Sequence, residues 1–168
     1  ACEGDLELRP FLEDGYILAG SSLCGGRAYA MLEQFYREAA GGNPESYYDR
    51  MYDQADAFIR QYGTAAAWNV TTTFSGTREN AQERGRITGI GVENFHPGAM
   101  TAGVIKGILD ELYQQYVKMC ELTGKKAVHL AGSGNGIRHN RLMQELAEEM
   151  FGLKMEIPEW QEEAACGA

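Results

Sequence analysis

The sequence predicts an α/β fold. Short apolar or β-branched runs, typical of strands, alternate along the chain with longer stretches whose apolar residues recur at helical spacing. Many of the 21 Gly residues lie between these segments, where they end helices or form turns. With 168 residues, 44% of them hydrophobic, the chain is long enough for one domain with a buried core.

In the first part of the chain, a hairpin precedes two helices. Two apolar runs flank a Glu-Asp-Gly turn and form the hairpin, and glycines end both helices. The predicted elements are strands 6–9 and 16–20 and helices 27–40 and 43–62. Five tyrosines of this region form either a packing face or a ligand surface. They are Tyr36, Tyr47, Tyr48, Tyr52 and Tyr62.

The rest of the chain is organised around one long helix. Pro97 fits its first turn, Gly124 fits its C-cap, and the apolar stripe between them predicts the central core helix. Asp110 and Glu111 are expected on its solvated face. The other predicted elements are strands 68–74 and 86–92, an apolar run before residue 132, a helix that ends before residue 152, a strand 153–157 and a helix from residue 159.

Charge and cysteine usage narrow the environment of the protein. A net charge of −9 and a sequence pI near 4.8 argue against nucleic acid or an anionic membrane as the main partner, because both require a basic surface. The cysteines form no CxxC pair and are expected as free thiols in a reducing cytosol: Cys2, Cys24, Cys120 and Cys166. The N-terminus does not resemble a signal peptide, and no apolar run approaches the roughly 20 residues of a membrane span. We therefore expect a cytoplasmic protein.

A glycine-rich turn near the C-terminus carries the strongest functional signal. Gly132, Gly134 and Gly136 follow an apolar run and precede an amphipathic helix. Glycine allows a backbone to approach a ligand closely, and a helix N-terminus supplies unpaired N–H groups. The arrangement is therefore typical of phosphate- or nucleotide-binding loops.

Several classes of loop share this pattern. A dinucleotide-binding loop would place Gly at the position of Ile137 and an acid near Glu156, and a methyltransferase loop would carry similar glycines. Both folds place the loop after their first strand, whereas here only one strand and part of a helix follow it. A P-loop is excluded, because no Gly-Lys-Ser/Thr follows. A turn that merely allows close packing of a strand and a helix remains an alternative.

Five segments carry a recognisable order of motifs. They are residues 18–30 (LAGSSLCGGRAYA), 73–78 (TFSGTR), 85–91 (GRITGIG), 132–140 (GSGNGIRHN) and 162–168 (EEAACGA). In this order they resemble the C-terminal half of FGGY carbohydrate kinases, most closely the sedoheptulokinase-like members. The resemblance covers essentially the whole chain.

The resemblance implies that residues 1–168 form the C-terminal nucleotide-binding lobe of such a kinase. Its fold would be an actin-like (ribonuclease H-like) ATPase lobe, with a mixed sheet flanked by helices. Members transfer the γ-phosphoryl group of ATP to a sugar hydroxyl, here of a ketose or polyol, with Mg²⁺ held largely through the nucleotide. In the family, the catalytic aspartate and most sugar contacts belong to the N-terminal lobe, and the first phosphate hairpin of the C-terminal lobe is expected to precede residue 1. No catalytic residue is therefore expected in this chain, its sheet is expected to be incomplete, and it is expected to be inactive alone.

The resemblance also assigns site residues. The adenosine-binding turn of the family matches Gly132, Ser133, Gly134 and Asn135. Arg138 or His139 falls where members often place a polar side chain near the adenine, and Asn140 would cap or orient the turn. Gly26 matches a glycine near the nucleotide at the start of the first helix of the lobe. Arg78 matches a motif near the interlobe region, with a solvated loop arginine as the alternative.

A non-enzymatic alternative is an isolated actin-like domain that binds ATP or ADP weakly or not at all. Strand edges left unpaired would then serve association, for instance in a homo-oligomer. A titration with nucleotide distinguishes this alternative from the kinase lobe.

Overall fold

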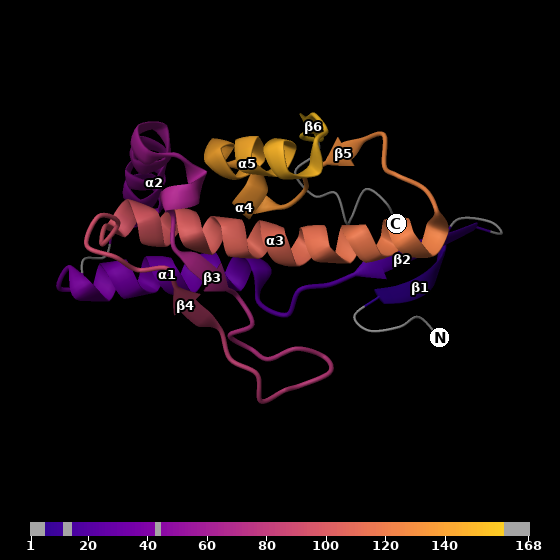
Figure 1. Cartoon of the computed structure of the whole chain (residues 1–168), viewed down its shortest axis with the longest axis horizontal. Coiled ribbons are helices and arrows are strands. Elements are labelled where there is room, and N and C mark those ends of the chain that lie inside the picture. The colour runs from indigo at the N-terminus through magenta and orange to yellow at the C-terminus, as the bar shows by residue number, and fades with distance from the viewer. Residues whose placement is uncertain (1–5, 12–14, 43–44, 160–168) are drawn as a thin grey trace.

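A 27-residue helix, α3 (Pro97–Thr123), forms the axis of the molecule (Figure 1). The computed structural model describes residues 6–11, 15–42 and 45–159. The other elements are, in chain order, β1 (Leu6–Phe11), β2 (Gly15–Gly20), α1 (Gly25–Ala39), α2 (Tyr48–Tyr62), the 3-10 turn η1 (Thr64–Ala66), β3 (Asn69–Thr71), β4 (Arg86–Thr88), β5 (Leu130–Ala131), α4 (Asn135–Arg138), α5 (Arg141–Phe151) and β6 (Met155–Glu156). None of the helices described is long and apolar enough to cross a membrane. The helix expected from residue 159 lies outside the described residues.

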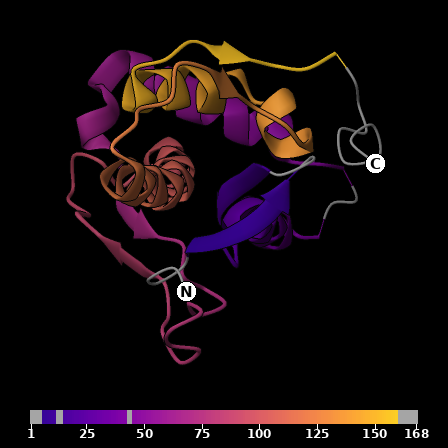
Figure 2. The same ribbon diagram turned by 90° about the vertical axis from the view of Figure 1, so that its right-hand side faces the viewer.

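Both ends of α3 are fixed as the sequence predicts. Pro97 stands in the first turn, and the imidazole of His96 accepts a hydrogen bond from Gly98 N at 2.9 Å. Gly124 ends the helix in the left-handed conformation, with φ +65°. Helices α1, α2 and α5 and strand β3 all pack against α3, and Figure 2 shows this arrangement along the helix axis. The hydrophobic core therefore surrounds α3.

Glycines let neighbouring backbone come very close to α3. A Cβ added at Gly107 would lie 2.2 Å from Val70 O, and one at Gly103 would lie 2.5 Å from Trp68 O. A Cβ at Gly98 would meet the backbone of α2 at 2.2 Å. Real side chains do not approach so closely, so the main chains of α2 and β3 pack directly on the helix.

The strands of the described residues pair as three separate two-stranded sheets. The β1–β2 and β3–β4 pairs are antiparallel, and the β5–β6 pair is parallel. The strands predicted over 68–74 and 86–92 are shorter than expected, since β3 ends at Thr71 and β4 at Thr88. Gly89 follows β4 with φ +72°, a left-handed conformation that takes the chain out of β pairing.

The segment around Trp68 closes the core beside α3. The indole is buried, and its Nε1 donates a hydrogen bond to Asn94 O at 2.8 Å. The side-chain nitrogen of Asn94 donates in turn to the carbonyl oxygens of Ala66 and Gly89, at 3.0 and 2.8 Å. The long connection from β4 to α3 is therefore held against the core by one buried asparagine.

Candidate functional site

A cleft of about 1090 Å³ opens between the start of α1, the start of α2, the middle of α3 and the segment from β5 to α5. Its volume suits a ligand of nucleotide size. It is lined by Gly26, Gly132, Ser133, Gly134, Asn135, His139 and Asn140, all of them predicted site residues. The fold thus brings together two segments that the sequence separates by about a hundred residues.

The walls of the cleft are aliphatic and aromatic. Helices α3 and α5 supply aliphatic side chains, and α2 supplies Tyr48 and Tyr52. The two interpretations of the tyrosine series therefore apply to different members. Tyr36 does not line the cleft and donates its hydroxyl to Pro97 O at 2.9 Å. A wall of this composition suits a flat aromatic ring such as a purine.

The glycines of the cleft fall into two kinds. A Cβ added at Gly26, Gly134 or Gly136 would meet no atom within 4 Å, so these positions leave open space. A Cβ at Gly132 would lie 2.6 Å from the sulfur of Met155, so a larger residue here would have to displace that side chain of β6. Gly134 also has φ +91°, which disfavours any other residue at the start of α4. The packing alternative therefore holds for Gly132 alone among these four positions.

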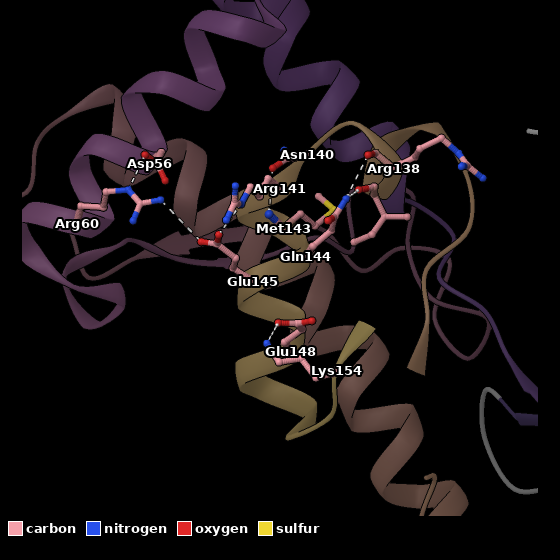
Figure 3. A network of polar contacts seen from close by, with 11 residues as sticks. Asp56, Arg60, Arg138, Asn140, Arg141, Met143, Gln144, Glu145, Glu148 and Lys154 are labelled. Atoms are coloured by element: carbon pink, nitrogen blue, oxygen red, sulfur yellow. Dashed lines mark hydrogen bonds and ion pairs between the residues drawn. The ribbon is translucent and has the colours of Figure 1, made fainter. Parts of the chain in front are cut away.

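The turn does not lead directly into the long helix that the sequence suggests. One turn of helix, α4, ends at Arg138, and α5 begins only at Arg141. Asn140 caps α5, because its side-chain oxygen accepts from Met143 N at 3.0 Å. The amide of Gln144 reaches back to carbonyl oxygens at the end of α4 (Figure 3). An asparagine just before an apolar helical pattern is a recognisable cap signal, and here the helix that it caps is α5.

The start of α1 lies at the cleft, where Gly25 and Gly26 line it. Ser22 Oγ accepts hydrogen bonds from Cys24 N and Gly25 N, at 3.2 and 2.9 Å. The same hydroxyl donates to Glu111 Oε2 at 2.9 Å, and Thr72 Oγ1 donates to that oxygen at 3.1 Å. Glu111 therefore does not simply lie on a solvated face: it fastens the start of α1 to α3 and to the end of β3. This contact joins residues 89 positions apart, which local patterns do not reveal.

The two predicted arginines point to other partners. Arg138 is not among the residues described as lining the cleft, and its Nη1 donates to Pro158 O at 2.7 Å. Of the two candidates near the adenine position, His139 is the one that lines the cleft. Arg78 binds Ser21 Oγ at 2.7 Å and the carboxylate of Glu7, and so ties the 73–85 loop to the hairpin.

The cleft contains few ionisable groups. Among the described lining residues, Asp49 and Arg141 carry charges, and His139 is the only imidazole. Burial raises the pKa of Tyr29 to about 12, although a hydrogen bond from Asn140 lowers it in part, so the hydroxyl stays neutral. Within the described ranges, no group of three or more His, Cys, Asp or Glu residues could hold a metal ion. Cys24 and Cys120 are free thiols, and the other two cysteines lie outside the described residues.

Several solved kinases share this fold. A ligand-bound xylulose kinase from Lactobacillus acidophilus matches 98% of this chain over 32% of its own, with a TM-score of 0.73 and 19% identity. A xylulose kinase from Bifidobacterium adolescentis matches 98% of this chain over 30% of its own, with a TM-score of 0.76 and 17% identity. A glycerol kinase from Plasmodium falciparum, solved with ADP, matches 90% of this chain over 28% of its own, with a TM-score of 0.71 and 18% identity. The chain therefore spans about a third of the length of these proteins. A comparison with curated proteins found no match.

A family model covers nearly the whole chain. The model described as the FGGY family of carbohydrate kinases, C-terminal domain, matches residues 9–168. The lobe has the actin-like ATPase fold that the motif order implies, and its cleft lies where the predicted residues converge. This chain belongs to the FGGY family of carbohydrate kinases, of which it carries the C-terminal domain.

Proposed function

We propose that this chain is the nucleotide-binding lobe of a kinase that phosphorylates a ketose or polyol hydroxyl with Mg-ATP. The observation that carries the proposal is the convergence of the glycine turn and the start of α1 on one cleft with aromatic walls. Open glycine positions on both sides leave room for a ligand against the backbone. The glycerol kinase solved with ADP shares this fold and supports a nucleotide as the ligand.

The residues of this chain would bind and orient the nucleotide. The turn from Gly132 to Asn135 would contact the adenosine, and Tyr48 and Tyr52 would cover its base. The N-terminus of α1 at Gly26 would face negative charge, which the helix dipole favours. Mg-ATP supplies the phosphoryl group. We assign the proton-accepting carboxylate and most sugar contacts to a second lobe, so this chain alone is expected to bind nucleotide without phosphorylating sugar.

The finer assignments rest on the motif order. The similarity of the five motifs, taken in order, to sedoheptulokinase-like members supports a ketose substrate. We further propose a cytoplasmic location, Mg²⁺ held through the nucleotide, and neither nucleic acid nor membrane as a partner. Activity assays with both lobes present, and with sedoheptulose, xylulose and glycerol side by side, would rank these substrates.

Calorimetric titration with Mg-ADP tests the nucleotide-binding proposal. The protein should bind saturably at one site, and Gly26→Leu should abolish binding by filling the cleft without backbone strain. Gly26→Ala is the matched control: it adds one methyl group in open space and should keep most of the affinity. Titration with ADP in the presence of EDTA measures the contribution of Mg²⁺. Tight binding of S-adenosylmethionine or NAD in place of ADP would contradict the proposal.

A second candidate function is association without catalysis. The strands of the described residues form only two-stranded sheets, which leaves edges available for pairing with another chain. Sedimentation analysis over a range of protein concentrations tests this candidate. Concentration-dependent oligomers together with no saturable ADP binding would favour it over the kinase lobe.

A further inference from the structure

A buried hydrogen bond connects the two sides of the cleft. Tyr29 lies in α1, one helical turn after Gly26, and is 8% exposed. Asn140 lies at the end of the 132–140 turn and is 5% exposed. The side-chain nitrogen of Asn140 donates to the Tyr29 hydroxyl at 3.2 Å, and both residues line the cleft. These two residues are 111 positions apart in the sequence.

Asn140 uses both ends of its amide. Its oxygen caps α5 through Met143 N at 3.0 Å, while its nitrogen serves Tyr29. Its backbone N–H donates to Ile137 O at 3.3 Å, within α4. Asn140 therefore stands at the joint between the glycine turn and α5, and the Tyr29 hydroxyl links that joint to α1.

Tyr29 also supports the aromatic wall. Its ring stacks against the ring of Tyr48, with centroids 5.6 Å apart and an interplanar angle of 23°. Tyr48 lines the cleft and is 42% exposed, whereas Tyr29 is buried behind it. Tyr29 therefore connects α1, to which it belongs, with α2 and with the end of the glycine turn.

We propose that Tyr29 is a positioning residue that keeps the glycine turn and the start of α1 at a fixed separation, so that the nucleotide meets a preformed cleft. The inference rests on the proposed nucleotide-binding function and adds a residue that acts through Asn140 and Tyr48. A cleft that is already ordered spares the ligand the cost of ordering it, so loss of the link should weaken binding.

Helix α1 provides a matched control. Tyr36 lies two turns after Tyr29 on the same helix, and its hydroxyl donates to Pro97 O at 2.9 Å without lining the cleft. Tyr29→Phe and Tyr36→Phe therefore remove the same atom. The Tyr29 hydroxyl loses its bond from Asn140, and the Tyr36 hydroxyl loses its bond to Pro97 O and a longer one, at 3.4 Å, from Thr101 Oγ1. Asn140→Ser keeps a favoured N-cap residue for α5 but removes the amide nitrogen that reaches Tyr29.

The test is calorimetric titration of Mg-ADP into the wild type and each variant, with thermal unfolding of every protein. We expect Tyr29→Phe to weaken ADP binding about fivefold to tenfold, and Tyr36→Phe to change it less than about twofold. Tyr36→Phe should lose at least as much thermal stability as Tyr29→Phe, because its hydroxyl makes two hydrogen bonds. Asn140→Ser should match Tyr29→Phe in affinity, and the double variant should be no weaker than either single variant, because both remove the same bond.

The outcomes separate the inference from the proposal beneath it. If Tyr29→Phe and Tyr36→Phe bind ADP equally well, or if the losses in the double variant add, the positioning role is wrong. If the wild type binds no ADP, the proposed function fails and the inference falls with it. Should Asn140→Ser fail to fold, the comparison of the two tyrosine variants still decides.

Discussion

Two regions around α3 are packed by different means. Where α2 and β3 meet the helix, glycines bring backbone onto backbone, as at Gly107 and Val70 O. Where β5, β6 and α5 form the wall of the cleft, side chains make the contacts, as at Gly132 and the Met155 sulfur. A network of side-chain hydrogen bonds and ion pairs completes this second region (Figure 3). A carbonyl group cannot move aside, whereas a thioether can, so the first region is a fixed frame and the second an adjustable wall.

Substitution in the frame should have the largest effect. Gly107→Ala places a methyl group 2.2 Å from Val70 O, and β3 or α3 must shift to admit it. We expect a loss of about 2–3 kcal/mol in the free energy of unfolding, even though alanine favours a helix by about 1 kcal/mol. Urea unfolding measures it. A variant as stable as the wild type would show that the frame yields as easily as the wall.

The hydrogen bond from Asn140 in the wall to Tyr29 of α1 should be sensitive to alkaline pH. The unfolded Tyr29 ionises near pH 10, whereas burial keeps the folded hydroxyl protonated until about pH 12. Its contribution to stability is therefore complete below pH 10 and is lost as the pH rises toward 12, by about 2–3 kcal/mol at most. Urea unfolding of the wild type and Tyr29→Phe at pH 8 and pH 11 measures the difference. If the free energy of unfolding changed equally between pH 8 and pH 11 in the two proteins, the burial of this hydroxyl would be contradicted.

The matched substitution in the wall should cost less. Gly132→Ala brings a methyl group to 2.6 Å from the Met155 sulfur and 3.0 Å from Ile157 Cδ1, and flexible side chains can turn away from it. We expect a loss below about 1 kcal/mol in the same urea experiment. A loss equal to that of Gly107→Ala would remove the distinction between the two regions.

The smallest effect on stability is expected for Glu148, which lies in α5. The pKa of Glu148 lies below its ordinary value, first because the carboxylate accepts from Met155 N and then because Lys154 lies beside it. A lowered pKa stabilises the fold above about pH 4, and that gain is lost as the pH falls further. Glu148→Gln should therefore lower the unfolding temperature slightly at pH 7 and not at pH 3. A constant difference at both pH values would exclude an ionic origin.

Local patterns in the sequence predict the helices better than the strands. The apolar spacing places α1 and α3 nearly at their observed bounds, because one face of a helix is read from neighbouring residues. Helix α2 begins later than predicted, at Tyr48. The backbone N–H of Tyr47, just before it, donates a hydrogen bond to the carboxylate of Glu33 in α1. The strand lengths are predicted less well: β3, β4 and β6 are shorter than predicted, whereas β1 is two residues longer. Residue preferences favour extended backbone without specifying how far pairing continues.

The sequence predicts the loops that line the cleft, but not the hydrogen bonds that hold these loops in place. Glycine spacing locates the turn at 132–136, and the motif order adds Gly26. The bonds that hold these parts together join residues distant in sequence, as Tyr29 with Asn140 and Ser22 with Glu111. Such pairs depend on how helices pack, which a local pattern does not contain.

Trp68 gives the protein an optical probe of its own frame. The sequence has two tryptophans, so replacing Trp160 with Phe leaves this indole as the sole strong emitter. Because Trp68 is buried and its Nε1 is held by Asn94 O, its fluorescence should be blue-shifted in the native state and move to the red only when the β3–α3 contact opens. If the emission stays constant while ADP binds, ligand binding in the cleft leaves the contact between β3 and α3 unchanged.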